Sequence, residues 1–537
     1  MLLCAIISYR INHYLRSSSM VFLIGRMLLV LGLLAGVWPK PSQASAILID
    51  CNTTAVSAAI SAGGAININC NSPTVLTFGS ELVMNQATEI NGNNNAIFDG
   101  QNTRRLLRSA NNLKITLRNL TIRNGRTTDQ GAGIKVGFWN TLSISNVRFE
   151  NNQATKDTAA CDGGGAIFIG GGSSAMIDHS TFINNRANNG GAINSLRTNL
   201  MVSNSSFEQN SAMHTAAINQ HGDCGGGGAI YIDGTRMPND GGPDGIVLLN
   251  NSYTSNTSNN HGGAIFIGLY SNETATIERS SFTNNSVTYA TSADWSGTGG
   301  AIWYGFAAGG VTNERLFINN STLEGNKAIG QGGGLWVDAP ATIRNTTFYA
   351  NDATDPRSYP DDQEWRKGNG GALAVNNNAA VDITNATFMN NHAGFNGGAI
   401  AGQTITIRNT LFYNNTTDWS IKIMQHCTNA LIDGGNNLQY PPKNPNPNYW
   451  NETNCTSSMR TPELTLSNIA NNGGSTRTAA LPAGSPAINL GNPASCSALD
   501  QRGYTRAGAC DVGAYEYNGA AFSPSHSIYI PLARKPN

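Results

Sequence analysis

The chain has 537 residues, with 33 Lys and Arg against 33 Asp and Glu, so its formal net charge is zero. This balance argues against a nucleic-acid binder, which needs a basic surface to neutralise phosphates. Charged residues make up only 12% of the chain, well below the usual ~25%. Hydrophobic residues nevertheless reach 40%, and there are 60 glycines. The composition therefore argues against a disordered chain and favours an all-β protein with many turns and a real core.

The first 46 residues have the pattern of a secretory signal peptide. An apolar run over residues 27–37 follows Arg26 and precedes Ala44-Ser45-Ala46. The run is shorter than the ~20 residues that a membrane-spanning helix requires, and the small residues form a cleavage site. We expect cleavage after Ala46, export of the remainder and no transmembrane span in the mature chain. An uncleaved N-terminal anchor is the alternative, and Met20 is an alternative start.

The cysteines fit an exported protein. The sequence has nine, and removal of the signal peptide with Cys4 leaves eight. An even number in an exported chain indicates disulfides, although eight cysteines permit 105 pairings. A metal site is the weaker interpretation, because no Cys-x2-Cys or His-x3-His spacing occurs. Sequence order suggests the pairs Cys51–Cys70, Cys161–Cys224, Cys427–Cys455 and Cys496–Cys510.

Two short motifs alternate along the middle of the chain. One is Gly-Gly-Ala-Ile or a close variant, and the other is an aromatic or apolar residue followed three positions later by asparagine. The stretch between them has alternating apolar residues, which predicts a strand with one buried face. The first motif begins at Gly164, Gly190, Gly227, Gly262, Gly299, Gly333, Gly370 and Gly397. The asparagines of the second are Asn152, Asn185, Asn210, Asn256, Asn285, Asn326, Asn351, Asn391 and Asn415.

These repeats predict a solenoid. A single unit cannot bury its apolar face alone, whereas stacked coils bury a continuous column. Strands in such a stack lie ~4.8 Å apart, so equivalent residues of successive coils should lie above one another. Asparagine tolerates left-handed backbone at bends, and Gly-Gly supplies positive φ in tight turns. The predicted fold is an all-β parallel β-helix; a β-propeller would need ~40–50 residues per blade, more than the shortest units contain.

The paired motifs Gly-Gly-Ala-Ile and Phe-x-x-Asn resemble the repeats of polymorphic outer-membrane proteins. More broadly, residues 47–430 resemble the right-handed parallel β-helix proteins of the pectate-lyase-like superfamily, most strongly over 131–415. The resemblance implies a single-stranded, right-handed coil. It does not imply one activity, because that superfamily contains lyases, hydrolases, adhesins and passenger domains.

The segments on either side of the repeat region, residues 131–430, differ from it. Residues 47–130 have weaker repeats, and we interpret them as an N-terminal cap with the first coils. A short amphipathic helix over Thr53 to Ala62 would cover the open end. Residues 431–462 contain a proline-rich stretch and predict a loop or linker.

The C-terminal part carries a second resemblance. Residues 463–520 contain Asp500-Gln501-Arg502-Gly503 and Cys510-Asp511-Val512-Gly513-Ala514-Tyr515-Glu516. These motifs are similar to those of the choice-of-anchor Q domain of bacterial surface proteins. We expect the domain to cap the β-helix, with residues 521–537 as a tail.

Every second coil carries a long loop between its asparagine and the next Gly-Gly, over residues 153–163, 211–226, 286–298 and 352–369. Stacking should place these loops in one row, and insertions on one face of a solenoid often mark its binding face. Aromatic rings stack on sugar rings and carboxylates accept hydrogen bonds from hydroxyls, so we expect a polysaccharide or cell-surface glycan as partner. Ordinary exposed polar loops are the alternative. The candidate ligand-binding residues are His221, Asp223, Asp294, Trp295, Tyr359 and Trp365.

Catalysis has weaker support. The candidates are Asp361, Asp362 and Glu364, which lie in a long insertion rather than on a rigid strand. A glycoside hydrolase needs two carboxylates ~5–9 Å apart. The set of motifs that is typical of polygalacturonases does not occur in the order that those enzymes have. The leading hypothesis is therefore a non-enzymatic adhesion or carbohydrate-binding protein. A polysaccharide lyase or glycoside hydrolase that uses the same loops, or an inert structural spacer, is the alternative.

Other ligands have little support in the sequence. No cofactor is expected, although Asp233 with Asp240 to Asp244 forms a candidate calcium site for which a plain surface turn is the alternative. We expect a monomer that is secreted or located in a bacterial cell envelope.

Overall fold

The computed structural model describes residues 46–155, 163–213, 224–235, 245–288, 297–307, 315–376, 379–418, 425–443, 454–506 and 508–521. The chain divides into two compact units, Met1–Ala46 and Ile47–Asn537. The predicted signal peptide lies outside the described residues, apart from Ala46, and its cleavage stays a prediction.

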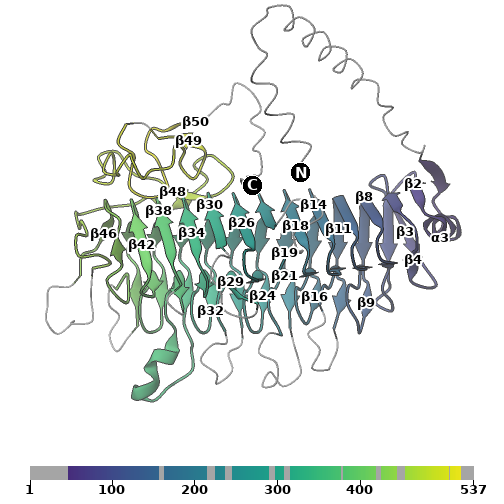
Figure 1. Cartoon of the computed structure of the whole chain (residues 1–537), viewed down its shortest axis with the longest axis horizontal. Helices are drawn as coiled ribbons and strands as arrows, with labels where there is room; N and C mark the ends of the chain where they lie inside the picture. Colours follow the sequence, from purple (N-terminus) through teal and green to yellow (C-terminus); the bar gives the residue numbers. More distant parts are fainter. Residues whose placement is uncertain are drawn as a thin grey trace, which may run out of the picture. The chain divides into compact units, whose positions relative to one another are not determined.

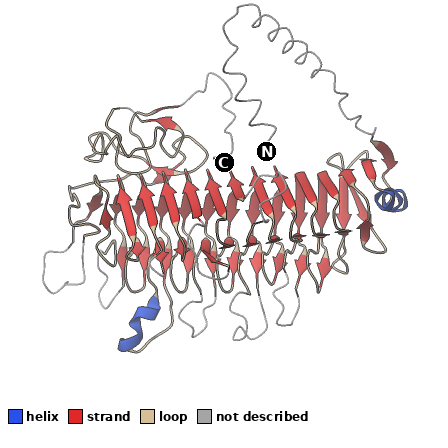
Figure 2. Cartoon of the chain, viewed as in Figure 1, coloured by secondary structure: helices blue, strands red, loops and turns tan. Residues whose placement is uncertain are grey.

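The second unit is a parallel β-helix, as the repeats predicted (Figures 1 and 2). One representative coil contains β17 (Ile193–Leu196), β18 (Asn199–Ser203), β19 (Ser206–Glu208) and β20 (Ser211–Ala212). β17 belongs to an eleven-stranded sheet, β18 and β19 belong to a large 25-stranded sheet, and β20 belongs to a ten-stranded sheet. Each strand pairs in parallel with its equivalents in the neighbouring coils.

The other strands of the eleven-stranded sheet are β4 (Leu82–Met84), β7 (Leu107–Ser109), β10 (Ile134–Val136), β13 (Ile167–Ile169), β21 (Ile230–Asp233), β25 (Ile265–Leu269), β29 (Ile302–Phe306), β33 (Leu335–Val337), β37 (Leu373–Val375) and β41 (Ile400–Ala401). Those of the ten-stranded sheet are β9 (Arg126–Thr127), β12 (Gln153–Ala154), β16 (Arg186–Ala187), β24 (Thr257–Ser258), β28 (Ser286–Val287), β32 (Lys327–Ala328), β36 (Asp352–Ala353), β40 (His392–Ala393) and β44 (Thr416–Thr417).

The large sheet has two columns of strands that share the long strands β8 (Lys114–Arg123) and β11 (Thr141–Glu150). The first column also contains β1 (Ile47–Asp50), β2 (Gly64–Asn69), β5 (Thr88–Asn91), β14 (Ser174–Asp178), β18, β22 (Ile246–Leu249), β26 (Thr274–Glu278), β30 (Arg315–Asn319), β34 (Ala341–Arg344), β38 (Val381–Thr384), β42 (Ile405–Arg408) and β45 (Ile432–Asp433). The second also contains β3 (Thr74–Thr77), β6 (Ala96–Asp99), β15 (Thr181–Ile183), β19, β23 (Ser252–Thr254), β27 (Ser281–Thr283), β31 (Thr322–Glu324), β35 (Thr347–Tyr349), β39 (Thr387–Met389), β43 (Leu411–Tyr413) and β46 (Leu438–Tyr440).

In the core, side chains at equivalent positions of successive coils stack on one another. The aromatic residues of the second motif are fully buried and stack face to face, because parallel strands repeat at ~4.8 Å. Leu323 takes the equivalent position in its coil and interrupts the file of rings. The consecutive ring centroids lie 5.0, 4.6, 5.0 and 4.6 Å apart from Phe149 through Phe182, Phe207 and Tyr253 to Phe282, and 4.7 and 5.1 Å apart from Phe348 through Phe388 to Phe412.

The asparagines of the second motif form a continuous buried ladder. The Nδ2 of Asn210 donates to the carbonyl of Phe182 and to Oδ1 of Asn256, both at 3.0 Å. The backbone N–H of Asn210 also donates to the same Oδ1, at 3.0 Å. Each amide thus satisfies backbone groups that the bend leaves without a partner in the sheets. The ladder continues through Asn152, Asn185, Asn210, Asn256, Asn285, Asn326, Asn351, Asn391 and Asn415.

The Gly-Gly motif precedes the last eight strands of the eleven-stranded sheet, β13 to β41, and its two glycines have different roles. Gly262 has a φ of +59°, which disfavours any residue with a Cβ. A Cβ on Gly263 would lie 2.0 Å from the carbonyl oxygen of Gly300 in the next coil. The first glycine is therefore required by the backbone conformation and the second by the close approach of successive coils.

The predicted N-terminal cap is present. The helix α3 (Thr53–Ala62) begins after Asn52, whose side chain accepts a hydrogen bond of 2.9 Å from the N–H of Ala55. Its buried residues Val56 and Ile60 pack onto the first layer of the core. A disulfide between Cys51 and Cys70 ties the cap to the first coils.

Residues 431–462 were expected to be a loop, but their described part continues the coils. β45 and β46 pair with β42 and β43, and the Cys427–Cys455 disulfide is fully buried in the core cluster. Met459 packs against the same cluster. The proline-rich stretch concealed this coil because its apolar residues are few and widely spaced. The described residues within 425–443 and 454–460 therefore add the last layer of the core.

Residues 463–521 cover the outer face of the large sheet over the last coils (Figure 1). Their structure is mostly irregular, with two short antiparallel pairs, β47 (Ile469–Ala470) with β48 (Thr478–Ala479) and β49 (Tyr504–Thr505) with β50 (Ala520–Ala521). Leu464, Leu481 and Val512 form a small apolar cluster with Leu411 and Leu438 of the coils. Two parts of the chain therefore cap the β-helix. The described residues between 425 and 460 close the end of the core, and residues 463–521 cover the outer face of the large sheet.

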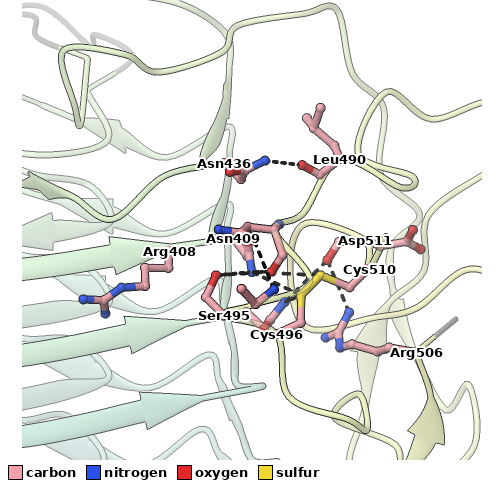
Figure 3. The surroundings of a disulfide bond; sticks show 12 residues. Arg408, Asn409, Asn436, Leu490, Ser495, Cys496, Arg506, Cys510 and Asp511 are labelled. Carbon is pink, nitrogen blue, oxygen red and sulfur yellow. Dashed lines mark hydrogen bonds between the residues drawn. A yellow bond between two sulfur atoms is a disulfide. The ribbon is translucent and has the colours of Figure 1, made fainter. Parts of the chain in front are cut away.

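The Cys496–Cys510 disulfide lies at the centre of this contact (Figure 3). Oδ1 of Asn409 accepts a hydrogen bond of 2.8 Å from the N–H of Asn492, and its Nδ2 lies 3.3 Å from Oγ of Ser495. The amide of Asn436 donates to the carbonyl of Leu490 at 2.6 Å. The outer face of the β-helix is therefore bound through asparagine side chains.

The two C-terminal motifs form one buried ionic network. Asp500 pairs with Arg502, and Glu516 pairs with Arg506 at 3.0 Å; all four side chains are almost completely buried. Burial raises the pKa of Asp511 and lowers the pKa of Arg506, although the neighbouring carboxylates oppose the shift of Arg506. Asp500 also accepts hydrogen bonds from three backbone N–H groups. The motifs therefore fix an irregular fold that has little apolar core of its own.

Candidate functional site

The ends of the long loops align along one side of the β-helix. We call this side, between each strand of the ten-stranded sheet and the following Gly-Gly, the loop edge. Isolated parallel bridges connect its coils, from Gly163 to Asn189, from Gly226 through His261 to Thr298, and from Gln331 through Asn369 to Asn396. The roots of the loops are thus held in register, as stacking requires.

Several predicted site residues lie outside the described residues. They are Cys161, His221, Asp223, Asp294 and Trp295. Cys224 is disulfide-bonded, but its pairing with Cys161 stays a prediction. The predicted ligand-binding role of the other four residues also stays a prediction.

The insertion at residues 352–369 is described along its backbone. It contains the 3₁₀ helix η3 (Asp361–Lys367), which extends beyond the coils (Figure 2). Asp361, Asp362 and Trp365 therefore lie together on this projecting segment, and their side chains lie outside the description. The N–H of Asp355 donates to the carbonyl of Lys367 at 2.8 Å and closes the base of the insertion.

Tyr359, a predicted ligand-binding residue, contributes to this closed base. Its hydroxyl donates to Oδ2 of Asp355 at 2.6 Å, and Nε of Arg357 donates to the same carboxylate at 2.9 Å. Burial raises the pKa of Asp355, but the hydrogen bonds from Arg357 and Tyr359 outweigh it and hold the pKa below its ordinary value. Burial and the neighbouring carboxylate raise the pKa of Tyr359 to about 12. The hydroxyl of Tyr359 therefore holds the base of the insertion together through Asp355.

Glu364, a candidate catalytic residue, is also engaged. Its Oε1 lies 2.5 Å from Nζ of Lys367 within the same turn of η3. The described residues contain no group of three or more His, Cys, Asp or Glu side chains that could hold a metal ion. Asp233, part of the candidate calcium site, accepts a hydrogen bond of 2.9 Å from the hydroxyl of Tyr270, while Asp240 to Asp244 lie outside the description.

An outer aromatic row runs beside the loop edge, on the solvent side of the eleven-stranded sheet. It consists of Tyr231, Phe266, Trp303 and Trp336, with ring centroids 4.5, 4.2 and 5.1 Å apart in that order. His261 of the loop edge lies 5.5 Å from the Trp303 ring. Phe266 and Trp336 are only 5% and 4% exposed, so the row is largely covered. It anchors the roots of the loops to a rigid surface.

Sequence reasoning missed this row, although a signal for it exists. In three consecutive copies of the first motif, Gly-Gly-Ala-Ile is followed directly by Tyr231, Phe266 or Trp303. Alternation along a strand places the residue after the buried isoleucine on the outer face. Three aromatic residues at one outward position of successive coils predict a stack.

Three surface cavities of the described part are lined by polar and charged residues. One lies over the bends between β12 and β16 and is lined by asparagines with Arg186. A second lies on the large sheet, and a third near Arg104 and Arg126 contains one acid, Glu81, which pairs with Arg105 and Arg108. None of these three cavities has the two carboxylates that glycoside hydrolysis requires.

The chain is similar to known proteins both in its repeats and among solved structures. Residues 146–170, 179–196 and 204–233 match the family described as the Chlamydia polymorphic membrane protein repeat. Among solved structures, the chain is similar to a crystal structure of pectate lyase Pel9A, with 15% identity and a TM-score of 0.33, over 87% of this chain and 90% of that chain. No curated protein matches the chain.

The helical segments of the described ranges, α3 and η3, are both too short to span a bilayer. The three described disulfides, Cys51–Cys70, Cys427–Cys455 and Cys496–Cys510, are those that sequence order predicted. The repeat match falls on strands β11 to β21, in the regular part of the coil. The chain is a parallel β-helix protein, and three stretches between residues 146 and 233 are similar to the polymorphic membrane protein repeat.

Proposed function

We propose that the protein is an exported cell-surface or envelope β-helix that binds glycan through the loops of its loop edge and catalyses no reaction. The polymorphic membrane protein repeats and the disulfides support this location, because disulfides persist in oxidising compartments outside the cytosol. The sequence pattern of a signal peptide supports the same location.

The outer aromatic row is the observation that supports binding most directly. Binding residues are concentrated on loops that a rigid scaffold positions. Here the stacked rings lie beside the loop roots, and His261 links the row to the loop edge. Trp295 and Trp365 belong to two loops of that edge, and each supplies an aromatic face for a sugar ring.

Two acids of the 352–369 insertion, the candidate Glu364 and the residue Asp355 at its base, have contacts that favour binding over catalysis. Glu364 is paired with Lys367, and the Asp355 carboxylate is occupied by Arg357 and Tyr359. A general acid needs a carboxyl group with a raised pKa, whereas the pKa of Asp355 is lowered. A loop that projects on a short 3₁₀ helix is also a less precise support for catalysis than a strand.

A glycan array tests this proposal. The labelled full chain is compared with the double variant Trp295→Ala/Trp365→Ala and with the control Trp139→Ala, whose side chain is 58% exposed on a different bend. We expect the double variant to lose at least tenfold in signal and the control to retain it. Equal binding by all three proteins would refute a role for the loops. Release of reducing ends or unsaturated sugars from a polysaccharide panel would contradict the non-enzymatic assignment.

A further inference from the structure

The bends between the two columns of the large sheet form a row of outward-facing side chains, which we call the bend row; its members are exposed from Asn146 to Arg279 and buried or half-buried from Asn320 to Asn436. Each member has a φ between 44° and 58°, which directs successive side chains to equivalent positions. From β11 onward, the row comprises Asn146, His179, Asn204, Asn250, Arg279, Asn320, Asn345, Asn385, Asn409 and Asn436.

The chain's own C-terminal segment binds one half of this row. Nδ2 of Asn345 donates to the carbonyl of Leu499 at 2.9 Å, and Nδ2 of Asn436 donates to the carbonyl of Leu490 at 2.6 Å. The carbonyl of Asn320 accepts a hydrogen bond of 3.1 Å from the Thr476 hydroxyl. These side-chain amides contact peptide carbonyls, so this half of the row recognises polypeptide backbone.

The other half of the row lines a groove. A cavity of 580 Å³ extends along the side chains from Asn146 to Arg279, and Ser475 of the C-terminal segment forms part of its wall. The groove therefore continues directly from the surface that the segment already occupies.

Two amides in the groove, those of Asn204 and Asn250, have a hydrogen to donate. Nδ2 of Asn345 uses one hydrogen along the row, to Oδ1 of Asn320, and the other for Leu499. In the groove, Nδ2 of Asn250 donates to Oδ1 of Asn204 at 2.8 Å, the same contact along the row. An amide nitrogen carries two hydrogens, and the second of Asn250 has no acceptor among the described residues. Nδ2 of Asn204 likewise donates one hydrogen, to Oδ1 of Asp178 at 2.8 Å, whereas Asn146 uses both of its hydrogens for Asn94 and Asn119. Asn204 and Asn250 thus repeat the donor pattern of the occupied half.

An apolar strip borders the groove. Met176, Met201 and Val247 occupy equivalent outward positions on β14, β18 and β22. Met176 is 53% exposed, while the other two are half-buried. An occupant of the groove therefore needs backbone carbonyls for the amides and apolar side chains for this strip.

Residues 522–537 meet both requirements and start nearby. The described chain leaves at Ala521, which pairs with Tyr504, and the Tyr504 hydroxyl lies against Gly473, two residues before Ser475 of the groove. The tail contains Ile528, Ile530 and Leu532 at alternating positions, which places three apolar side chains on one face of an extended chain. At ~3.3 Å per residue, it reaches roughly 50 Å, more than the ~20 Å that five coils occupy.

We propose that residues 522–537 bind in this groove in an extended conformation. The C-terminal part of the chain then covers the bend row from β11 to β45. Backbone carbonyls of the tail accept hydrogen bonds from the groove amides, and its isoleucines pack on Met176 and Met201.

Hydroxyl-radical footprinting tests this inference. We compare the oxidation rate of Met176 in the full chain with its rate in a chain that ends at Ala521. Truncation should accelerate oxidation of Met176 at least threefold. A synthetic peptide of residues 522–537 should restore protection. Exposed Trp139 and buried Met389 are internal controls and should keep their rates.

A second variant separates docking from folding. The full-length double variant Ile528→Ser/Ile530→Ser should match the truncated chain in Met176 oxidation while keeping the melting temperature of its coils. Equal Met176 rates in all proteins would overturn the inference. Protection that rises with protein concentration would also overturn it, because the occupant would then be a second copy of the chain.

Discussion

The ring of Tyr253 stacks on the ring of Phe282 with centroids 4.6 Å apart, at a position where the neighbouring coils of this file carry phenylalanine. Its hydroxyl is buried and has no hydrogen-bond partner among the described residues, and burial raises its pKa. We expect Tyr253→Phe to stabilise the protein by about 1 kcal/mol, because it removes an unsatisfied polar group and keeps the stack. Urea unfolding measures the change. The reverse change, Phe282→Tyr, should destabilise by about 1–3 kcal/mol.

The asparagine ladder should be sensitive at any internal position. Oδ1 of Asn256 accepts from the N–H of Asn210, and its Nδ2 donates to the carbonyl of Phe207, both at 3.0 Å. Asn256→Ala leaves both buried groups without partners, so we expect a loss of about 3–5 kcal/mol in unfolding free energy. The control Asn71→Ala, at an exposed position, should change stability by less than ~0.5 kcal/mol. Similar effects from both variants would contradict the role of the ladder.

His426 terminates the ladder and should make stability depend on pH. Its Nδ1 lies 3.0 Å from Nδ2 of Asn415, and its Nε2 lies 3.1 Å from the carbonyl of Pro441. Since the amide donates to Nδ1, the neutral ring carries its hydrogen on Nε2. Burial lowers the pKa of His426 from 6.5 to about 4.

The unfolded chain therefore binds a proton below pH 6.5 that the folded chain takes up only near pH 4. Stability should fall as the pH decreases through this window, by at most about 3 kcal/mol, and this loss should level off below pH 4. Urea titrations at pH 7.5 and 4.5 measure it. His426→Gln keeps a donor and an acceptor without a titrating ring, so it should reduce this pH dependence. An unchanged slope in the variant would refute the assignment.

Gln501 should control the attachment of the C-terminal segment. Its Oε1 accepts from the Thr347 hydroxyl at 2.6 Å, and its Nε2 donates to Oγ1 of Thr322 at 2.8 Å. Gln501→Ala leaves these buried hydroxyls unsatisfied, and we expect faster proteolysis between residues 463 and 521 with the coils intact. Limited proteolysis followed by mass spectrometry detects the cleavage. Ser475→Ala, at an exposed position of the same segment, serves as the control and should leave the rate unchanged.

The repeats allowed the coils to be predicted because each buried position recurs at a fixed place in every unit. Phe182 and Phe207 lie in register with Asn185 and Asn210 three residues later, as the second motif implied. The three described disulfides also followed sequence order, because each joins segments that are close along the chain.

Contacts without a repeat were harder to predict. Residues 463–521 carry recognisable motifs, but nothing in these motifs identifies the bend row as their binding surface, since the row consists of ordinary turn asparagines such as Asn345. Tyr359 was predicted to bind ligand from its residue type alone. Its hydrogen bond to Asp355 depends on how the insertion folds back, which the sequence does not reveal. The outer aromatic row was not predicted because its residues follow the buried isoleucine on the outward face, whereas the repeat pattern reports the inward positions.

The register of identical side chains from coil to coil makes length an adjustable property of this protein. Each added turn would bring its own ring for the interior file and its own amide for the ladder, and it would meet the same partners above and below. Duplication or deletion of one whole turn in the middle would therefore leave every neighbour satisfied. Such a molecule can vary the distance between its two ends in steps of ~4.8 Å without redesigning its interior.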